Sequence, residues 1–84
     1  MTVYTVVWVE SALDELADLW INEPDRSSIT NATNAVDQEL RTDANTKGSI
    51  LSEGLRALTK PPIQVIFGVR DDDRLVEVLK VRRA

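Results

Sequence analysis

The sequence contains neither cysteine nor histidine. Without cysteine, the chain can form no disulfide, no thiolate metal site and no cysteine nucleophile. Without histidine, it lacks the side chain most often used for proton transfer near neutral pH, so acid–base chemistry would depend on carboxylates, Lys, Arg or Tyr4. We therefore expect no metal and no cofactor.

Glycine and proline are scarce as well, with three of each, while 43% of the residues are hydrophobic. This composition is typical of a folded globule, and 84 residues suffice for one core. We expect a single domain over residues 1–84. No hydrophobic run approaches a membrane span, and the N-terminal residues lack a cationic segment followed by an apolar stretch. A cytoplasmic protein without membrane contact is therefore expected.

The two halves of the chain differ in charge. Residues 1–42 contain two cations and eight anions, whereas residues 43–84 contain eight cations and six anions, which together give the net charge of −4. Such patterning bears on partners rather than on the fold. It predicts a mildly basic surface in the C-terminal half that faces an anionic or polar partner.

The N-terminal half predicts a strand followed by two helices. Residues 2–9 are apolar at nearly every position, which favours a strand covered on both faces. Ser11 is the predicted cap of a helix that ends near Ile21. One stripe of this helix should face the core, and Trp8 and Trp20 are both interpreted as core residues. The stripe consists of Leu13, Leu16, Ala17 and Trp20.

The second helix is expected to begin after Asp25, which is placed to cap it. Its apolar residues step by three and four, as a helix packed on one side requires. They are Ile29, Ala32, Val36 and Leu40. Because the connection over residues 22–25 is short, the two helices should form an antiparallel hairpin.

Beyond a polar loop at residues 43–48, the apolar period changes to two and the chain should be sheet. Residues 50–58 predict one irregular strand, interrupted by Gly54, which permits a bulge or a close backbone approach. Pro61 and Pro62 end this strand. Residues 63–70 and 75–81 predict two further strands. The aspartates at 71–73 lack the spaced ligands and closing Glu of a calcium loop, so a solvated turn is expected.

This order of elements predicts an α+β fold. Three consecutive C-terminal strands can pair through short turns, while the helices cover one face of the sheet. The expected architecture is a two-layer β-α-α-β-β-β arrangement, an antiparallel sheet with a helical hairpin on one face.

Five segments, in their order and spacing, resemble the RelE/ParE toxins of bacterial type II toxin–antitoxin modules over essentially the whole chain. They are residues 4–8 (YTVVW), 12–20 (ALDELADLW), 54–58 (GLRAL), 62–69 (PIQVIFGV) and 73–82 (DRLVEVLKVR). The resemblance implies a RelE/ParE-like sheet with the first strand beside the last. It also implies an antitoxin that wraps the sheet and the helices.

The family has two branches with different activities. By resemblance, the RelE kind implies cleavage of mRNA on the ribosome by cations on a concave sheet face, whereas the ParE kind implies inhibition of DNA gyrase by protein contact. Ser52 and Gly54 stand where RelE-type basic residues are expected, and Gln64 replaces an expected Arg. The remaining catalytic candidates are Arg56, Arg82 and Arg83.

These differences favour a ParE-like toxin that acts by binding proteins. They favour a binding function over enzymatic activity. A ribosome-dependent endoribonuclease and a non-toxic binding module are the alternatives. An antitoxin is the first expected partner and gyrase, or the ribosome with mRNA, the second; a homodimer is also open. The residues expected to contact a partner are Arg56, Arg70, Lys80, Arg82 and Arg83.

Two of these assignments have structural alternatives. Arg56 could instead form an ion pair with a helix carboxylate and so hold the two layers together. The C-terminal cations could instead be a solvated chain end, because three cations in a chain of net charge −4 make a thin footprint for nucleic acid.

Overall fold

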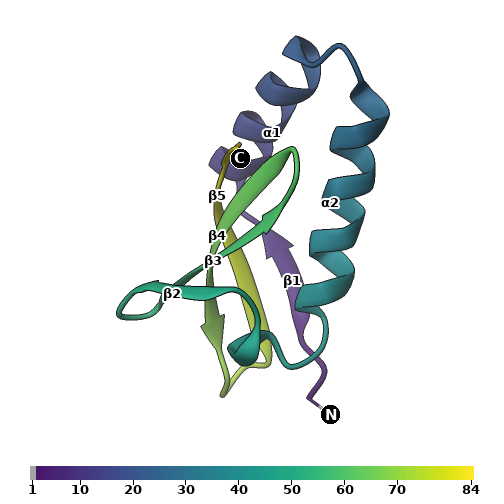
Figure 1. The fold of residues 1–84 in the computed structure, drawn as a ribbon. Helices are drawn as coiled ribbons and strands as arrows, with labels where there is room; N and C mark the ends of the chain where they lie inside the picture. Colours follow the sequence, from purple (N-terminus) through teal and green to yellow (C-terminus); the bar gives the residue numbers. More distant parts are fainter. Residues whose placement is uncertain (1) are drawn as a thin grey trace.

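The computed structural model describes residues 2–84 as two α-helices and five strands (Figure 1). The elements are β1 (Thr5–Trp8), α1 (Glu10–Asn22), α2 (Arg26–Leu40), the short 3-10 helix η1 (Ala44–Thr46), β2 (Ser49–Ser52), β3 (Leu55–Lys60), β4 (Ile63–Arg70) and β5 (Leu75–Arg83). Among these, no helix has the length and apolar content needed to cross a membrane.

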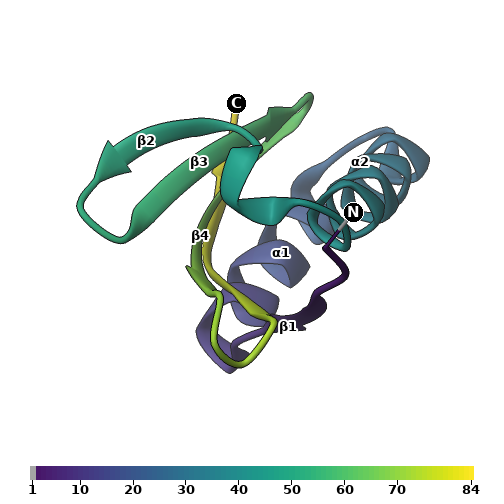
Figure 2. The same ribbon diagram turned by 90° about the horizontal axis from the view of Figure 1, so that it is seen from below.

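The strands form one sheet in the order β1-β5-β4-β3-β2, so the first strand lies beside the last, as expected. The helical hairpin covers one face, and the β2–β3 hairpin extends away from it (Figures 1 and 2). The predicted two-layer α+β fold is therefore confirmed. One detail differs, because β1 runs parallel to β5. No tight turn joins these two strands, so nothing imposes the antiparallel direction that hairpins impose on the others.

The single strand expected over residues 50–58 is instead the hairpin formed by β2 and β3. Glu53 and Gly54 lie in its turn, and Gly54 adopts a φ of +79°, which a residue without a Cβ tolerates. The sheet therefore has five strands where four were expected. Gly54, which was expected to interrupt one strand, lies in the turn that reverses the chain between two strands.

Strand β1 is not covered on both faces, contrary to expectation. It lies at the edge of the sheet, and the helices cover only one of its faces. The side chain of Val7 on the other face is 42% exposed. Apolar residues at nearly every position therefore did not indicate a central strand here.

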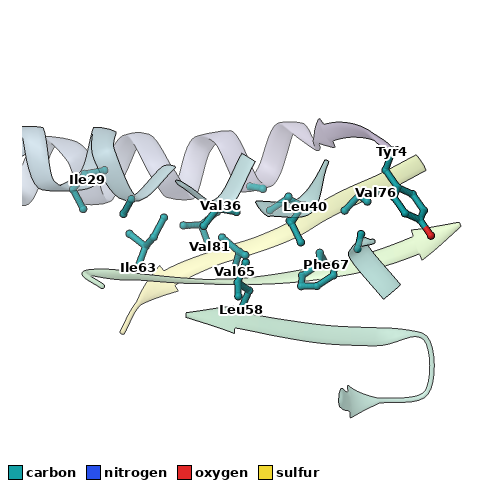
Figure 3. Packing of buried hydrophobic residues seen from close by; sticks show 14 residues of the cluster. Tyr4, Ile29, Val36, Leu40, Leu58, Ile63, Val65, Phe67, Val76 and Val81 are labelled. Atoms are coloured by element: carbon teal, nitrogen blue, oxygen red, sulfur yellow. The ribbon is translucent and has the colours of Figure 1, made fainter. Parts of the chain in front are cut away.

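The core lies between the helices and the sheet (Figure 3). Helix α2 contributes Ile29, Ala32, Val36 and Leu40, as its periodicity predicted. Strands β4 and β5 contribute most of the facing side chains, which are Ile63, Val65, Phe67, Val76, Val78 and Val81. Each large aliphatic or aromatic side chain buried in this way stabilises the fold by roughly 1.5–3 kcal/mol.

Helix α1 differs from its prediction in two respects. It begins at Glu10 after Val9, without a side-chain cap, so Ser11 lies inside the helix. Its fully buried residue is Ala12, whereas Leu13 and Trp20 are 49% and 40% exposed. Leu16 of the predicted stripe packs against the core, but Leu13, Ala17 and Trp20 are exposed, so the stripe meets the core only in part.

The cap of α2 is confirmed. A carboxylate oxygen of Asp25 accepts a hydrogen bond from the backbone N–H of Ser28 at 3.4 Å and from the hydroxyl of Ser27 at 2.7 Å. The hydrogen bond from the Ser27 hydroxyl, and to a smaller extent that from the Ser28 N–H, lower the pKa of Asp25. The negative charge is thereby held at the N-terminus of the helix, where the helix dipole favours it.

Candidate partner-binding surfaces

The register of the sheet shows which strand residues share a face. Val65 and Phe67 of β4 point into the core, so Gln64 and Ile66, which alternate with them, point to the opposite face. Directly paired residues of neighbouring strands lie on the same face. We name this side the outer sheet face and define it by Thr59, Gln64, Ile66, Arg70, Glu77, Lys80 and Arg82.

A row of polar side chains crosses the outer sheet face from β5 to β3. The Nε of Arg82 donates to Oε1 of Gln64 at 2.6 Å, and Nε2 of Gln64 donates to the hydroxyl of Thr59 at 3.1 Å. Nearby, Nε of Arg70 lies 3.0 Å from a carboxylate oxygen of Glu77. Lys80 is exposed opposite Ile66 and forms no ion pair within residues 2–84.

The other two candidate cations point to the helix side of the sheet. Arg56 pairs with Phe67 in register, and Arg83 pairs with Ile63. The Nε of Arg56 donates to the backbone oxygen of Lys47 at 2.7 Å. The guanidinium of Arg83 forms an ion pair with Glu23. The five cations therefore divide into three on the outer sheet face and two on the side that carries the helices.

Within residues 2–84, Arg56 does not form the ion pair that was considered for it; its guanidinium donates to a backbone carbonyl instead. Two other cations hold the layers together through helix carboxylates. Lys60 Nζ lies 3.2 Å from Glu39 of α2, and Arg83 pairs with Glu23 immediately after α1. Two cations of the C-terminal half are therefore paired with anions of the N-terminal half within the molecule.

A pocket of about 300 Å³ lies beside the β2–β3 hairpin. Arg56 contributes to its lining together with Glu53 and Asp71, so the charges there are mixed. Apolar atoms come mainly from Ile50, Leu55 and Val69. This lining lacks the several convergent cations that an anion requires.

A second pocket of about 320 Å³ lies between α1 and α2, and we name it the helix groove. It is almost wholly apolar and receives the stripe of α1 that was expected in the core. Its lining residues are Leu13, Leu16, Ala17, Trp20, Ile29, Thr30, Thr33 and Asn34. The guanidinium of Arg26 lies 4.5 Å from the centre of the Trp20 ring, at one end of the groove.

The middle of α2 carries a sequence signal for this groove. Thr30, Thr33 and Asn34 are poor helix formers in the middle of α2, and they line the groove opposite the apolar stripe of α1. A helix that faced its neighbour through a dry core would carry apolar residues there. Trp8, by contrast, is half-buried and packs against the core, in line with its interpretation.

Across residues 2–84, no three carboxylates converge as a metal ion requires. The aspartates at 71–73 form an exposed turn between β4 and β5, as predicted.

Comparison with known proteins places this fold. No protein-family model matches the sequence, and no curated protein matches it significantly. Among solved structures, the chain is similar over 100% of its length to a chain of the RelBE2 toxin–antitoxin complex of Mycobacterium tuberculosis, with 94% of that chain covered, a TM-score of 0.80 and 18% identity. A chain of the chromosomal ParDE system of P. aeruginosa gives a TM-score of 0.69 at 19% identity, with 100% and 99% coverage.

The isolated RelE toxin of E. coli is also similar, with a TM-score of 0.58, 19% identity, and 96% of this chain and 84% of that chain covered. The fold is that of RelE- and ParE-type toxins. The resemblance inferred from the five sequence segments is confirmed at the level of the fold, and both branches of the family are represented among the similar structures.

Proposed function

We propose that this protein is the toxin of a type II toxin–antitoxin module, that it acts by binding a protein target, and that a cognate antitoxin neutralises it. The observation that carries the proposal is the fold, which matches chains of the RelBE2 and ParDE systems over the full length of this chain. The target that we propose is DNA gyrase, as in the ParE branch, because the arrangement of the cations supports protein binding over RNA cleavage.

The arrangement of the cations supports binding over catalysis. Cleavage of a phosphodiester without histidine needs several cations that converge on the developing negative charge. The three catalytic candidates do not converge, since Arg82 lies on the outer sheet face while Arg56 and Arg83 lie on the opposite one. Each of them is also held by a partner within the chain.

The helix groove is the surface that we assign to the antitoxin. Its apolar lining and the exposed side chains of Leu13 and Trp20 fit the apolar face of an amphipathic helix. The surrounding helices belong to the acidic half of the chain, with two cations and eight anions in residues 1–42. The matching antitoxin segment is therefore an amphipathic helix that carries Lys or Arg beside its apolar face.

Titration calorimetry with the protein encoded by the neighbouring gene tests this assignment. The expected result is a tight complex that Leu13→Asp weakens by at least about 10-fold, because the substitution puts a charge into an apolar contact. Ile21→Asp is the matched control, since Ile21 is an exposed apolar residue of α1, 62% against 49% for Leu13, and does not line the groove. Equal affinities for the two variants, or no complex at all, would contradict the assignment.

Two assays separate the targets. The ParE-like activity predicts that the purified chain inhibits DNA supercoiling by gyrase and leaves mRNA intact in a translating extract. The RelE-like alternative is favoured by the polar row of Arg82, Gln64 and Thr59 on the uncovered sheet face and by the likeness to RelE. It predicts cleavage at codon positions that disappears on Arg82→Ala.

A further inference from the structure

Strand β2 has a free edge. It ends the sheet, and its outer side pairs with no strand within residues 2–84. Edge strands in natural proteins usually carry a charge or a proline that prevents pairing with another chain. Here the strand reads Ser-Ile-Leu-Ser, with Ile50 74% and Leu51 51% exposed. The hairpin that carries it projects from the body of the molecule (Figures 1 and 2).

We propose that β2 pairs with β2 of a second copy of this chain, antiparallel and across a two-fold axis at Ile50. A two-fold interface must be complementary to itself, because the same residues come from both sides. In this register Ile50 faces Ile50 of the second copy, and two apolar side chains that are exposed in the single chain cover each other. The two sheets become one continuous sheet.

The charges at the ends of β2 agree with this register. Lys47 lies just before β2, three residues ahead of Ile50, and Glu53 lies in the turn that follows β2, three residues beyond it. Antiparallel pairing about Ile50 therefore brings Lys47 of each copy near Glu53 of the other, so that two opposite-charge pairs flank the apolar centre. A parallel pairing would place like charges together at both ends. This complementarity is the reason to assign the edge to a second copy rather than to an unrelated strand.

The dimer should be weak. The register of β2 and β3 shifts between Ile50 and Ser52, so Leu51 bulges and the regular ladder is short. On the other side of β2, Arg56 of β3 pairs with Ile50. Its guanidinium donates to the backbone oxygen of Lys47, which holds the start of β2 in place. A short edge-to-edge contact buries far less than about 1,200 Å², so association is expected only at high protein concentration.

A single cysteine tests the register directly, because the chain has none of its own. Facing residues of antiparallel strands have Cα atoms about 4.5–5.5 Å apart, which lies within the span of a disulfide. Ile50→Cys should therefore give a covalent dimer under mild oxidation. Ile21→Cys, which is 62% exposed on α1, is the control and should crosslink much more slowly. Equal crosslinking rates for the two variants overturn the proposal.

Charge reversal gives an independent test by sedimentation velocity over a range of concentrations. Lys47→Glu and Glu53→Lys should each abolish the dimer by placing like charges together, and the double variant should restore it. A wild type that stays monomeric at near-millimolar concentration overturns the proposal, as does a double variant no more dimeric than the single ones. Circular dichroism of each variant checks folding. The groove assignment is unaffected, because neither Lys47 nor Glu53 lines it.

Discussion

At the scale of single residues, Tyr4 shows how a polar group is accommodated at the end of the core. Its side chain is buried against the core, and its hydroxyl donates to a carboxylate oxygen of Asp71 at 2.5 Å. This bond, together with burial, raises the pKa of Tyr4, while nearby Arg74 acts in the opposite direction. It ties the chain just before β1 to the turn between β4 and β5.

Tyr4→Phe should lower the midpoint of thermal unfolding by a few degrees at neutral pH, because it removes this hydrogen bond but keeps the buried ring. Since the folded state raises the tyrosine pKa, the stabilisation is fully present below the ordinary tyrosine pKa and is lost as pH rises through the folded-state value. Urea unfolding at several alkaline pH values should show the wild type converging on the variant. A difference that widens with pH would contradict this account.

At the scale of elements, the β2–β3 hairpin depends on two glycines with positive φ, Gly48 at +65° and Gly54 at +79°. They differ in their surroundings. A Cβ on Gly48 would lie 2.2 Å from the backbone oxygen of Ala57, whereas a Cβ on Gly54 would meet nothing within 4 Å. Gly48 is therefore required by both conformation and space, and Gly54 by conformation alone.

Gly48→Ala should therefore destabilise the protein clearly more than Gly54→Ala, since the second substitution costs only the left-handed backbone strain of about 1 kcal/mol. Chemical denaturation of the two variants measures the difference. Equal unfolding free energies would show that the hairpin moves away from the added methyl group at no cost.

The elements also show what the sequence could and could not predict. Strand β4 occupies the predicted residues 63–70, and α2 begins after the predicted cap Asp25. In both cases local pattern and packing agree. The stripe of α1 was only partly predicted, because periodicity records that a helix has an apolar face, not how much of that face meets the core and how much lines a surface groove.

The sequence also could not predict which face of the sheet each cation of β5 occupies. The register shifts between Ile66 and Phe67, so Val78 and Val81 both face the core although three positions separate them. A shift of one residue reverses the faces of all later side chains. Strict alternation along β5 would therefore assign its C-terminal cations to the wrong sides. Nothing in the local sequence marks this shift.

At the scale of the whole molecule, an acidic helical layer packs on a more basic sheet. The apolar core between the two layers contributes most of the stability of this contact. Lys60 and Glu39 are partly exposed, so their ion pair should contribute little. A double-mutant cycle with Lys60→Ala and Glu39→Ala should give a coupling energy below about 1 kcal/mol. A coupling of several kcal/mol would mean that electrostatics governs the contact between the layers.

The account of function also applies to the whole molecule, because the fold supplies two separate surfaces. The helix groove is assigned to the antitoxin, and the outer sheet face with Arg70, Lys80 and Arg82 remains the predicted contact for the target. A variant that loses antitoxin binding should therefore keep its toxicity.

Bacterial growth during induced expression tests the central claim most directly. The account predicts that the chain alone arrests growth, that co-expression of the neighbouring gene restores it, and that Leu13→Asp prevents the restoration while the arrest persists. Growth that continues unchanged when the folded chain is expressed alone would contradict the account and leave a non-toxic binding module as the remaining interpretation.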